Sequence, residues 1–273
     1  MAVELKQLVS AFEQIWPLSG AESWDAPGLV SGEQTQRVSR VLLSVDVTSE
    51  IISEAQDGEF NLVFSHHPYL LRGVQSVAES GAKGSVLAKA IRSGVSIYSA
   101  HTNADVVESG VSDVLAKAFG LRGTVPLVAN SDSNTGHGRV GDLVQPMKLG
   151  DFARFVSRIL PATASGIRVA GDYEQIIQKV ALCGGAGDSF IADAFASGAD
   201  VYVTSDLRHH PTQDAVEQSR VNEAPMALMD VSHWASEWVW LDVAAAQLSE
   251  LFPTVQFVVS HIRTDPWEFT VTQ

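Results

Sequence analysis

The chain has 273 residues, of which 45% are hydrophobic and 18% charged, enough to bury one large core or two smaller ones. Its formal net charge is −14, and no cluster of Lys and Arg stands out along it. This excludes a general nucleic-acid binder, which needs a basic face against phosphates, and favours a small-molecule or metal partner.

The ends and the cysteine content indicate a cellular compartment. Met1–Ser10 carries Glu4 and Lys6 and lacks the long apolar run of a signal peptide. No stretch approaches the roughly 20 apolar residues that span a bilayer. The one cysteine, Cys183, excludes an intrachain disulfide and favours a reducing environment. We therefore expect a cytoplasmic protein that does not bind membranes.

Strands and helices alternate along the chain. Short apolar runs predict strands at Val41–Val47, Asn61–Ser65, Val95–Ala100, Lys179–Cys183, Asp200–Thr204, Pro225–Val231 and Val255–Ser260. Helical periodicity between them predicts helices at Lys6–Ile15, Ser49–Ala55, Gly84–Ser93, Val111–Ala118, Phe152–Ile159, Ser189–Ser197, Asp214–Ser219 and Ala235–Leu251. This alternation predicts an α/β fold with a largely parallel sheet covered by helices on both faces.

The stretch Thr124–Leu149 interrupts this rhythm, because it is rich in Gly, Ser and Asn over Asn130–Gly138. We interpret it as a loop or hairpin at a lobe boundary. The expected division is an N-terminal α/β lobe over residues 1–125, a connecting hairpin or loop and helix over 126–165, and a C-terminal α/β lobe over 166–273. A faint similarity between Leu62–Pro68 and Val201–Pro211, both with a His-His-Pro ending, leaves a structural duplication open.

Histidines follow three of the predicted strands. His66 and His67 come directly after Asn61–Ser65, and His101 and His233 follow two later strands. Asp105 and Glu237 lie four residues beyond His101 and His233, a spacing that shares one face of a helix. Because ligands collect at the carboxyl ends of strands in α/β sheets, we expect these side chains to converge.

Four imidazoles and two carboxylates provide about three groups for each of two metal ions. That number leaves coordination positions for water, which is typical of a catalytic site. Without thiolate ligands, zinc, iron and manganese all fit. Each motif taken alone also fits a solvated helix face or a helix cap, so core or cap histidines are the competing interpretation.

The motifs together resemble the Nif-three-like family, also called the GTP cyclohydrolase I type 2 family, over nearly the whole chain. The segment Glu22–Leu29 is similar to its W-D-N-x-G-L element, although Ala26 and Pro27 depart from it. The remaining matches are Ser65–Pro68, His101–Asp105, Gly136–Arg139 with Gly141, Cys183–Ser189, Thr204–His210 and Ser232–Glu237. Ser205 stands where the family usually has Gly, and Ser232 where it usually has Gly or Ala. No departure removes a candidate ligand.

By that resemblance His66, His67, Asp105, His233 and Glu237 would bind two divalent ions, most simply zinc, with Glu237 as the bridge. His101 would be a ligand or an outer-shell group. The family also implies a three-layer α/β/α fold of two similar lobes with the metal site between them, and a homohexamer. The short stretch between Arg139 and Ile167 implies a form without the family's mid-chain inserted domain.

Three further features have two interpretations each. The turn Gly184–Ser189 fits a phosphate site at a helix start or, preferably, a tight turn with Asp188 or Ser189 as N-cap. Arg208 and His210 fit an anionic substrate site or a helix cap. Trp234, Trp238 and Trp240 indicate core or subunit packing.

Two functions remain open from the sequence. The first is a dinuclear metal hydrolase acting on a small molecule such as a nucleotide or phosphoester, with Glu237 or His101 relaying the proton and Arg208 and His210 binding the substrate. The alternative is a non-enzymatic metal-binding scaffold or regulatory protein.

Overall fold

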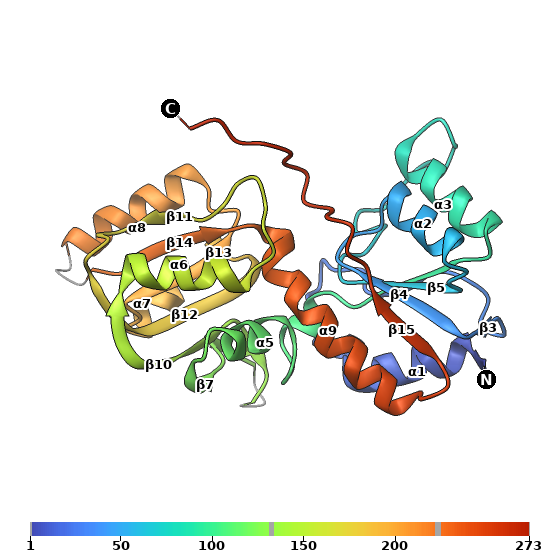
Figure 1. Cartoon of the computed structure of the whole chain (residues 1–273), viewed down its shortest axis with the longest axis horizontal. Helices are drawn as coiled ribbons and strands as arrows, with labels where there is room; N and C mark the ends of the chain where they lie inside the picture. Colours follow the sequence, from blue (N-terminus) through green and yellow to red (C-terminus); the bar gives the residue numbers. More distant parts are fainter. Residues whose placement is uncertain (1, 131–133, 222–224, 273) are drawn as a thin grey trace. The chain divides into compact units, whose positions relative to one another are not determined.

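The computed structural model describes residues 2–130, 134–221 and 225–272, which form two compact units, each built around one mixed β-sheet (Figure 1). Unit 1 consists of Met1–Ala104 and Leu241–Thr264, and unit 2 of Asp105–Trp240 and Asp265–Gln273. Within the described residues, no helix combines the length and apolar character that crossing a bilayer requires.

The central sheet of unit 1 is mostly parallel. Its described strands run in the order β15 (Gln256–Val259), β4 (Arg40–Ser44), β5 (Leu62–Ser65), β6 (Ser96–Ser99) and β2 (Gly28–Ser31). The first four are parallel neighbours, and β2 pairs antiparallel with β6. Two short strands, β1 (Val3–Glu4) and β3 (Arg37–Val38), pair separately.

Helices cover both faces of this sheet, because successive residues of a strand point to opposite sides. Val63 of β5 belongs to a buried cluster with Ile51 and Ile52, whereas the next residue, Phe64, packs against Phe12 with ring centroids 5.0 Å apart. The helical elements of unit 1 are α1 (Leu5–Ile15), η1 (Leu18–Gly20), α2 (Ser49–Asp57) and α3 (Ala82–Arg92), and α4 (Thr102–Asp105) crosses into unit 2.

The central sheet of unit 2 combines a parallel middle with antiparallel flanks. The described strands run in the order β11 (Arg168–Ala170), β14 (Ala227–Val231), β13 (Val201–Ser205), β12 (Ile176–Ala186), β10 (Arg139–Lys148) and β7 (Arg122–Val125). Only β12, β13 and β14 are parallel to one another. A small hairpin pairs β8 (Val128–Ala129) with β9 (Gly136–His137).

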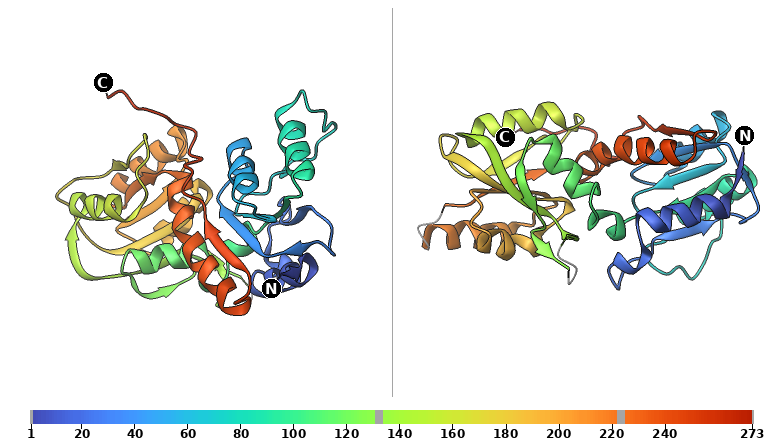
Figure 2. Two further views of the ribbon diagram at one scale, coloured as in Figure 1. Left: turned by 45° about the vertical axis from the view of Figure 1, so that its right-hand side comes forward. Right: turned by 90° about the horizontal axis from the view of Figure 1, so that it is seen from below.

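The helices of unit 2 also lie on both faces of its sheet, as the right-hand view of Figure 2 shows for α6 and α8. Its helical elements are α5 (Val111–Ala118), α6 (Leu149–Ile159), η2 (Asp188–Phe190), α7 (Ile191–Ala196) and α8 (His209–Val221). Helix α9 (His233–Leu251) begins in unit 2 and ends in unit 1. Tyr202 packs with Ile191 of α7 and Ala215 of α8 in one buried cluster. The α/β fold with helices on both faces of each sheet is therefore confirmed.

The predicted strands and helices all form, but one stretch was interpreted wrongly. Thr124–Leu149 contains not only a hairpin but also the ten-residue strand β10, inside the sheet of unit 2. Its inward positions are Arg139, Gly141 and Leu143, so two of the three buried residues are not the large apolar residues that reveal a strand. Both central sheets are mixed: that of unit 1 is largely parallel as expected, apart from β2, whereas only the middle of the unit 2 sheet is parallel. Residues 131–133 of the expected loop lie outside the described residues.

The boundaries expected from the sequence differ from the two units. β15 pairs with β4, so the chain returns to unit 1 after residue 240 instead of completing a C-terminal lobe. β7 pairs with β10 and thereby belongs to unit 2, although it falls within residues 1–125. Long-range strand pairing sets these boundaries, and local composition does not reveal it.

Candidate metal-binding groups

Three parallel strands of unit 1 deliver polar side chains to one edge of the sheet. β4, β5 and β6 are in register, with Ser44 opposite Ser65 and Ser65 opposite Ser99. The residues that follow these strand ends include Asp46, His66, His67 and His101. Because the carboxyl ends of parallel strands meet at one edge, side chains distant in sequence become neighbours there.

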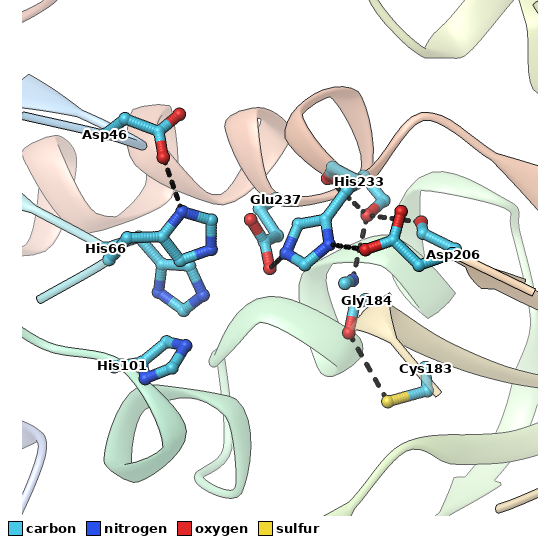
Figure 3. A network of polar contacts seen from close by, with 12 residues as sticks. Asp46, His66, His101, Cys183, Gly184, Asp206, His233 and Glu237 are labelled. Carbon is cyan, nitrogen blue, oxygen red and sulfur yellow. Dashed lines mark hydrogen bonds and ion pairs between the residues drawn. The ribbon is translucent and has the colours of Figure 1, made fainter. Parts of the chain in front are cut away.

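His66, His67 and His101 form one group that fits a metal ion. Figure 3 labels His66 and His101. Their candidate ligand nitrogens all lie within 4.8 Å of one another. The ring centroids are 5.1 Å apart for His66 and His67, and 5.2 Å and 5.4 Å from these rings to that of His101. The convergence predicted for these three histidines is therefore present within unit 1.

Each of the three imidazoles is oriented through its Nδ1 atom. His66 Nδ1 lies 2.9 Å from the carbonyl oxygen of Ala100, and a carbonyl can only accept, so this nitrogen carries the proton. His67 Nδ1 lies 2.7 Å from Asp46 Oδ1, and His101 Nδ1 lies 2.7 Å from Asp25 Oδ1. In a neutral imidazole with Nδ1–H, the lone pair is on Nε2, which is the arrangement of a metal-ligating histidine with an outer-shell acceptor.

Asp25 is the most completely held of these acceptors. Its side chain is fully buried and accepts hydrogen bonds from His101 Nδ1, from the backbone N–H groups of Thr102 (3.0 Å) and Ala26 (2.7 Å), and from the Thr102 hydroxyl. Burial alone would raise the pKa of Asp25, but the hydrogen bonds from His101 and Thr102 outweigh it and lower the pKa to about 2. Asp25 is therefore ionised at neutral pH and acts as a fixed acceptor for His101.

Unit 2 carries a second histidine–carboxylate group, on the first turn of α9 (Figure 3). His233 Nε2 lies 2.9 Å from Glu237 Oε1, and His233 Nδ1 lies 2.7 Å from Asp206 Oδ2. Burial alone would lower the pKa of His233, but the charge of Glu237 and the hydrogen bond with Asp206 raise that pKa well above its usual value of 6.5. A metal ion at this group would compete with a proton for the Nε2 lone pair of His233.

Asp206 has an unusual backbone conformation. It directly follows β13 and has φ of 57°, in the left-handed region that costs most non-glycine residues about 1 kcal/mol or more. This conformation accompanies the contact between its carboxylate and His233. Strain of this kind at the end of a strand is typical of a functional position.

The glycine-rich turn after β12 supports the same group. Gly185 has φ of 66°, and a Cβ atom there would lie 2.4 Å from Glu237 Oε1 and 3.2 Å from His233 Nε2. Its N–H donates to the Ser236 hydroxyl at 3.0 Å, and the N–H of Gly184 donates to the Ser112 hydroxyl at 3.2 Å. The N–H groups of Gly184 and Gly185 are thus bonded to hydroxyls of the protein, and the absence of a side chain at Gly185 leaves room for Glu237.

The expected N-cap role of Asp188 or Ser189 was wrong. The residue before α7 is Phe190, and Asp188 instead accepts an ion-pair hydrogen bond from Arg208 Nε. Cys183, which precedes the turn, is buried, and burial raises the pKa of its thiol to about 12. The thiol is therefore protonated at neutral pH.

Ser232, a departure from the family pattern, has a structural reason. Its hydroxyl accepts from the backbone N–H of Ala235 at 3.2 Å and donates to Asp265 Oδ2 at 2.6 Å. Ser232 thus caps the helix that begins at His233. The substitution stabilises the start of the helix that carries the ligand candidates.

The other predicted site residues are placed as follows. Asp105 ends α4, and the loop after it is fixed by buried Arg139, which donates to the carbonyl oxygen of Val107 at 2.9 Å. Arg208 is paired with Asp188, and His210 is exposed on α8 beside His209. A role of Asp105 as ligand, and of Arg208 and His210 in substrate binding, stays a prediction.

Sequence reasoning missed the three acidic residues that orient the histidines: Asp25, Asp46 and Asp206. Two of them lie inside segments that resemble family motifs, Glu22–Leu29 and Thr204–His210. An acid just after a strand end was the signal that could have identified Asp46 and Asp206, whereas Asp25 does not come just after a strand of the described chain.

Comparison with known proteins shows which family the chain belongs to. The family model described as Duf34/NIF3 (NGG1p interacting factor 3) matches residues 3–266. A "GTP cyclohydrolase 1 type 2 homolog" of Streptomyces coelicolor is 43% identical over 270 residues, covering 96% of this chain and 93% of the relative. A relative of the same name from Clostridium perfringens is 31% identical and covers 98% of this chain and 100% of its own length.

Solved structures agree with this assignment. A Bacillus cereus protein related to NIF3 superposes with a TM-score of 0.90 at 25% identity, over 98% of this chain and 99% of the other. A hypothetical protein of Staphylococcus aureus gives a TM-score of 0.87 at 28% identity, over 98% and 99%. Because such relatives match along their full lengths, this is the short form of the fold. The chain belongs to the Duf34/NIF3 family, that of the GTP cyclohydrolase 1 type 2 homologs.

Proposed function

We propose that this chain is a metal-dependent hydrolase that holds two divalent ions through His66, His67, Asp105, His233 and Glu237. Zinc is the first candidate, and iron or manganese fits the same imidazole and carboxylate donors. That ligands from the two units share ions is carried over from the family resemblance of the motifs. The name of the relatives, GTP cyclohydrolase 1 type 2 homolog, supports a nucleotide such as GTP as the first substrate to test.

One observation carries the metal assignment. Each of four histidines has its Nδ1 atom within hydrogen-bond distance of an oxygen acceptor. The pairs are His66 with Ala100 O, His67 with Asp46, His101 with Asp25, and His233 with Asp206. Histidines that merely fill a core need no such common orientation, whereas metal ligands need Nε2 available and the ring fixed. The donor set therefore fits divalent ions on its own chemistry.

Divalent ions bound there would supply Lewis acidity, which activates water and polarises an electrophilic carbon or phosphorus centre. The chain itself would manage the proton. His101 can accept a proton at Nε2, because the ionised Asp25 at its Nδ1 stabilises the resulting imidazolium. Glu237 is buried beside His233, where its carboxylate can hold a proton or bridge two cations.

The other expected properties remain proposals of the same kind. The homohexamer follows from the resemblance, the cytoplasmic location from the cysteine content and the lack of a signal peptide, and Arg208 and His210 are the proposed contacts for an anionic substrate. Light scattering of the purified chain measures the hexamer directly, and a mass near that of one subunit would contradict it.

Metal content decides between a metal protein and ordinary core histidines. The protein is purified without a His-tag, and elemental analysis is made on wild type, His66→Ala/His233→Ala and the exposed pair His209→Ala/His210→Ala as control. We expect about two ions per chain in wild type and the control, and loss in the first variant. Wild type that neither carries nor takes up zinc, iron or manganese would end the proposal.

Turnover then separates the hydrolase from a non-enzymatic metal scaffold. Metal-loaded wild type and His101→Ala are assayed with GTP and with phosphoesters, and metal content is measured in the same samples. A hydrolase in which His101 is an outer-shell acid–base group predicts turnover that falls by about 100-fold or more in His101→Ala while the ions remain, whereas loss of the ions in this variant would make His101 a ligand. Metal retention without any turnover favours the scaffold.

A further inference from the structure

The large aromatic side chain of Trp24 is solvent-exposed beside the histidines of unit 1. Trp24 is 59% exposed, and its ring centroid lies 5.9 Å from that of His101 with the planes at 78°. Exposing an indole forfeits the burial that normally stabilises it. The other tryptophan with comparable exposure is Trp267, at 65%, whereas Trp16, Trp234 and Trp240 are buried.

The segment that presents Trp24 is held in place at both sides of it. The N–H of Glu22 donates to the Thr102 hydroxyl at 2.9 Å, and the N–H of Asp25 donates to the carbonyl oxygen of Glu22 at 3.0 Å. Asp25 itself is anchored to His101 and to Thr102. The indole is thus carried by a turn that the histidine group itself fixes, and its exposure is not the result of a loose end.

The same buried carboxylate therefore fixes two things: the imidazole of His101 and the position of the neighbouring indole. A preformed aromatic surface next to a catalytic centre is suited to a flat ligand, because stacking is tolerant of substituents and costs little ordering. Among the described residues, none forms a hydrogen bond with the Trp24 indole. A planar ring held against it would lie beside the proposed metal ligands.

We propose that Trp24 is a substrate-binding residue that stacks on a planar heterocycle, such as the base of a purine nucleotide, while the rest of the substrate reaches the metal-binding histidines. Asp25 is the positioning residue of this platform. The inference rests on the proposed function and deepens it, since it assigns the substrate class: a molecule with a flat aromatic ring, rather than a simple phosphoester.

Binding of GTP and of inorganic tripolyphosphate to the zinc-loaded full chain tests the proposal. Both probes carry three phosphates, but only GTP carries the planar ring. Calorimetry is made on wild type, Trp24→Ala, Trp24→Phe and the control Trp267→Ala, which removes an indole of comparable exposure. We expect Trp24→Ala to weaken GTP binding about tenfold or more, the usual size of a lost base-stacking contact, and Trp24→Phe to restore most of it.

We expect Trp24→Ala to leave the affinity for tripolyphosphate unchanged and Trp267→Ala to leave the affinity for GTP unchanged. Equal GTP affinities of wild type and Trp24→Ala would overturn the proposal. So would a Trp24→Ala variant whose mass in light scattering differs from that of wild type, because Trp24 would then act in subunit assembly. Wild type that binds GTP no more tightly than tripolyphosphate would overturn it too. Zinc content of the same samples reports separately on the metal centre, so failure of the stacking role and failure of the metal site are distinguishable.

Discussion

The chain contains the tripeptide His-His-Pro twice, and the two copies have different structures. His66 and His67 come directly after β5, where their Nδ1 atoms bond to Ala100 O and Asp46. His209 and His210 come four residues after β13 and begin α8, where both are exposed. The position relative to the strand end, not the tripeptide, decides whether the imidazoles reach the edge of the sheet.

The edge of unit 2 receives its imidazole from elsewhere. His233 follows β14 and is oriented by Asp206, which follows β13. Both sheet edges thus carry a histidine that is oriented by an oxygen acceptor, but the strands and sequence motifs that provide it differ. A faint sequence duplication is therefore a poor guide to which histidines are equivalent.

The largest expected difference is in zinc affinity, between removal of the first histidine pair and removal of the second. His66→Ala/His67→Ala should weaken zinc binding by more than about 100-fold, because loss of outer-shell partners alone costs about 10- to 100-fold. His209→Ala/His210→Ala should leave zinc binding unchanged. Competition titration with a chelator measures both, and equal losses in the two variants would remove the distinction between the copies.

Gly185 offers a sharper test of the edge of unit 2. Gly185→Ala places a Cβ atom 2.4 Å from Glu237 Oε1 on a backbone with φ of 66°. We expect destabilisation by about 1–3 kcal/mol and weaker zinc binding, because Glu237 must move. Denaturant unfolding and zinc titration provide the two measurements.

The matched control for this variant is Gly198→Ala. Gly198 has φ of 71°, but no atom lies within 4 Å of its Cβ position. It should therefore show the backbone cost of about 1 kcal/mol and unchanged zinc affinity. If both alanine variants weaken zinc binding equally, the contact with Glu237 is not the cause.

Asp25 predicts a pH dependence for the edge of unit 1. Its pKa falls from 3.8 to about 2 in the folded chain, so its contribution to stability is complete above about pH 5 and is lost as the pH falls towards 2. In metal-free protein, the free energy of unfolding of wild type should exceed that of Asp25→Asn by up to about 2 kcal/mol at pH 6. This difference should shrink towards pH 3. A gap that does not change with pH would mean that the hydrogen-bond geometry, and not the carboxylate charge, is responsible.

The smallest expected effect concerns the start of α9. Ser232→Ala removes the cap on the N–H of Ala235 and should cost about 1 kcal/mol in the free energy of unfolding. Zinc affinity should stay within about twofold, because His233 remains fixed by Asp206. A large loss of zinc would show that the cap, rather than Asp206, sets the position of this histidine.

The sequence alone determined the order of strands and helices, because hydrophobic periodicity is a local signal. It also identified His66, His67 and His101 as neighbours, because each follows a strand of one parallel sheet. β10 was missed, because its buried positions are occupied by Arg139 and Gly141 as well as Leu143.

Only the tertiary structure revealed the acceptors that orient these histidines and the true limits of the two units. Asp25 meets His101 across 76 positions of the chain, and Asp206 meets His233 across 27. Residues 256–259 return to pair with β4 near the start of the chain. Such contacts depend on strand pairing and on side-chain direction at a sheet edge, which no local pattern of residues encodes.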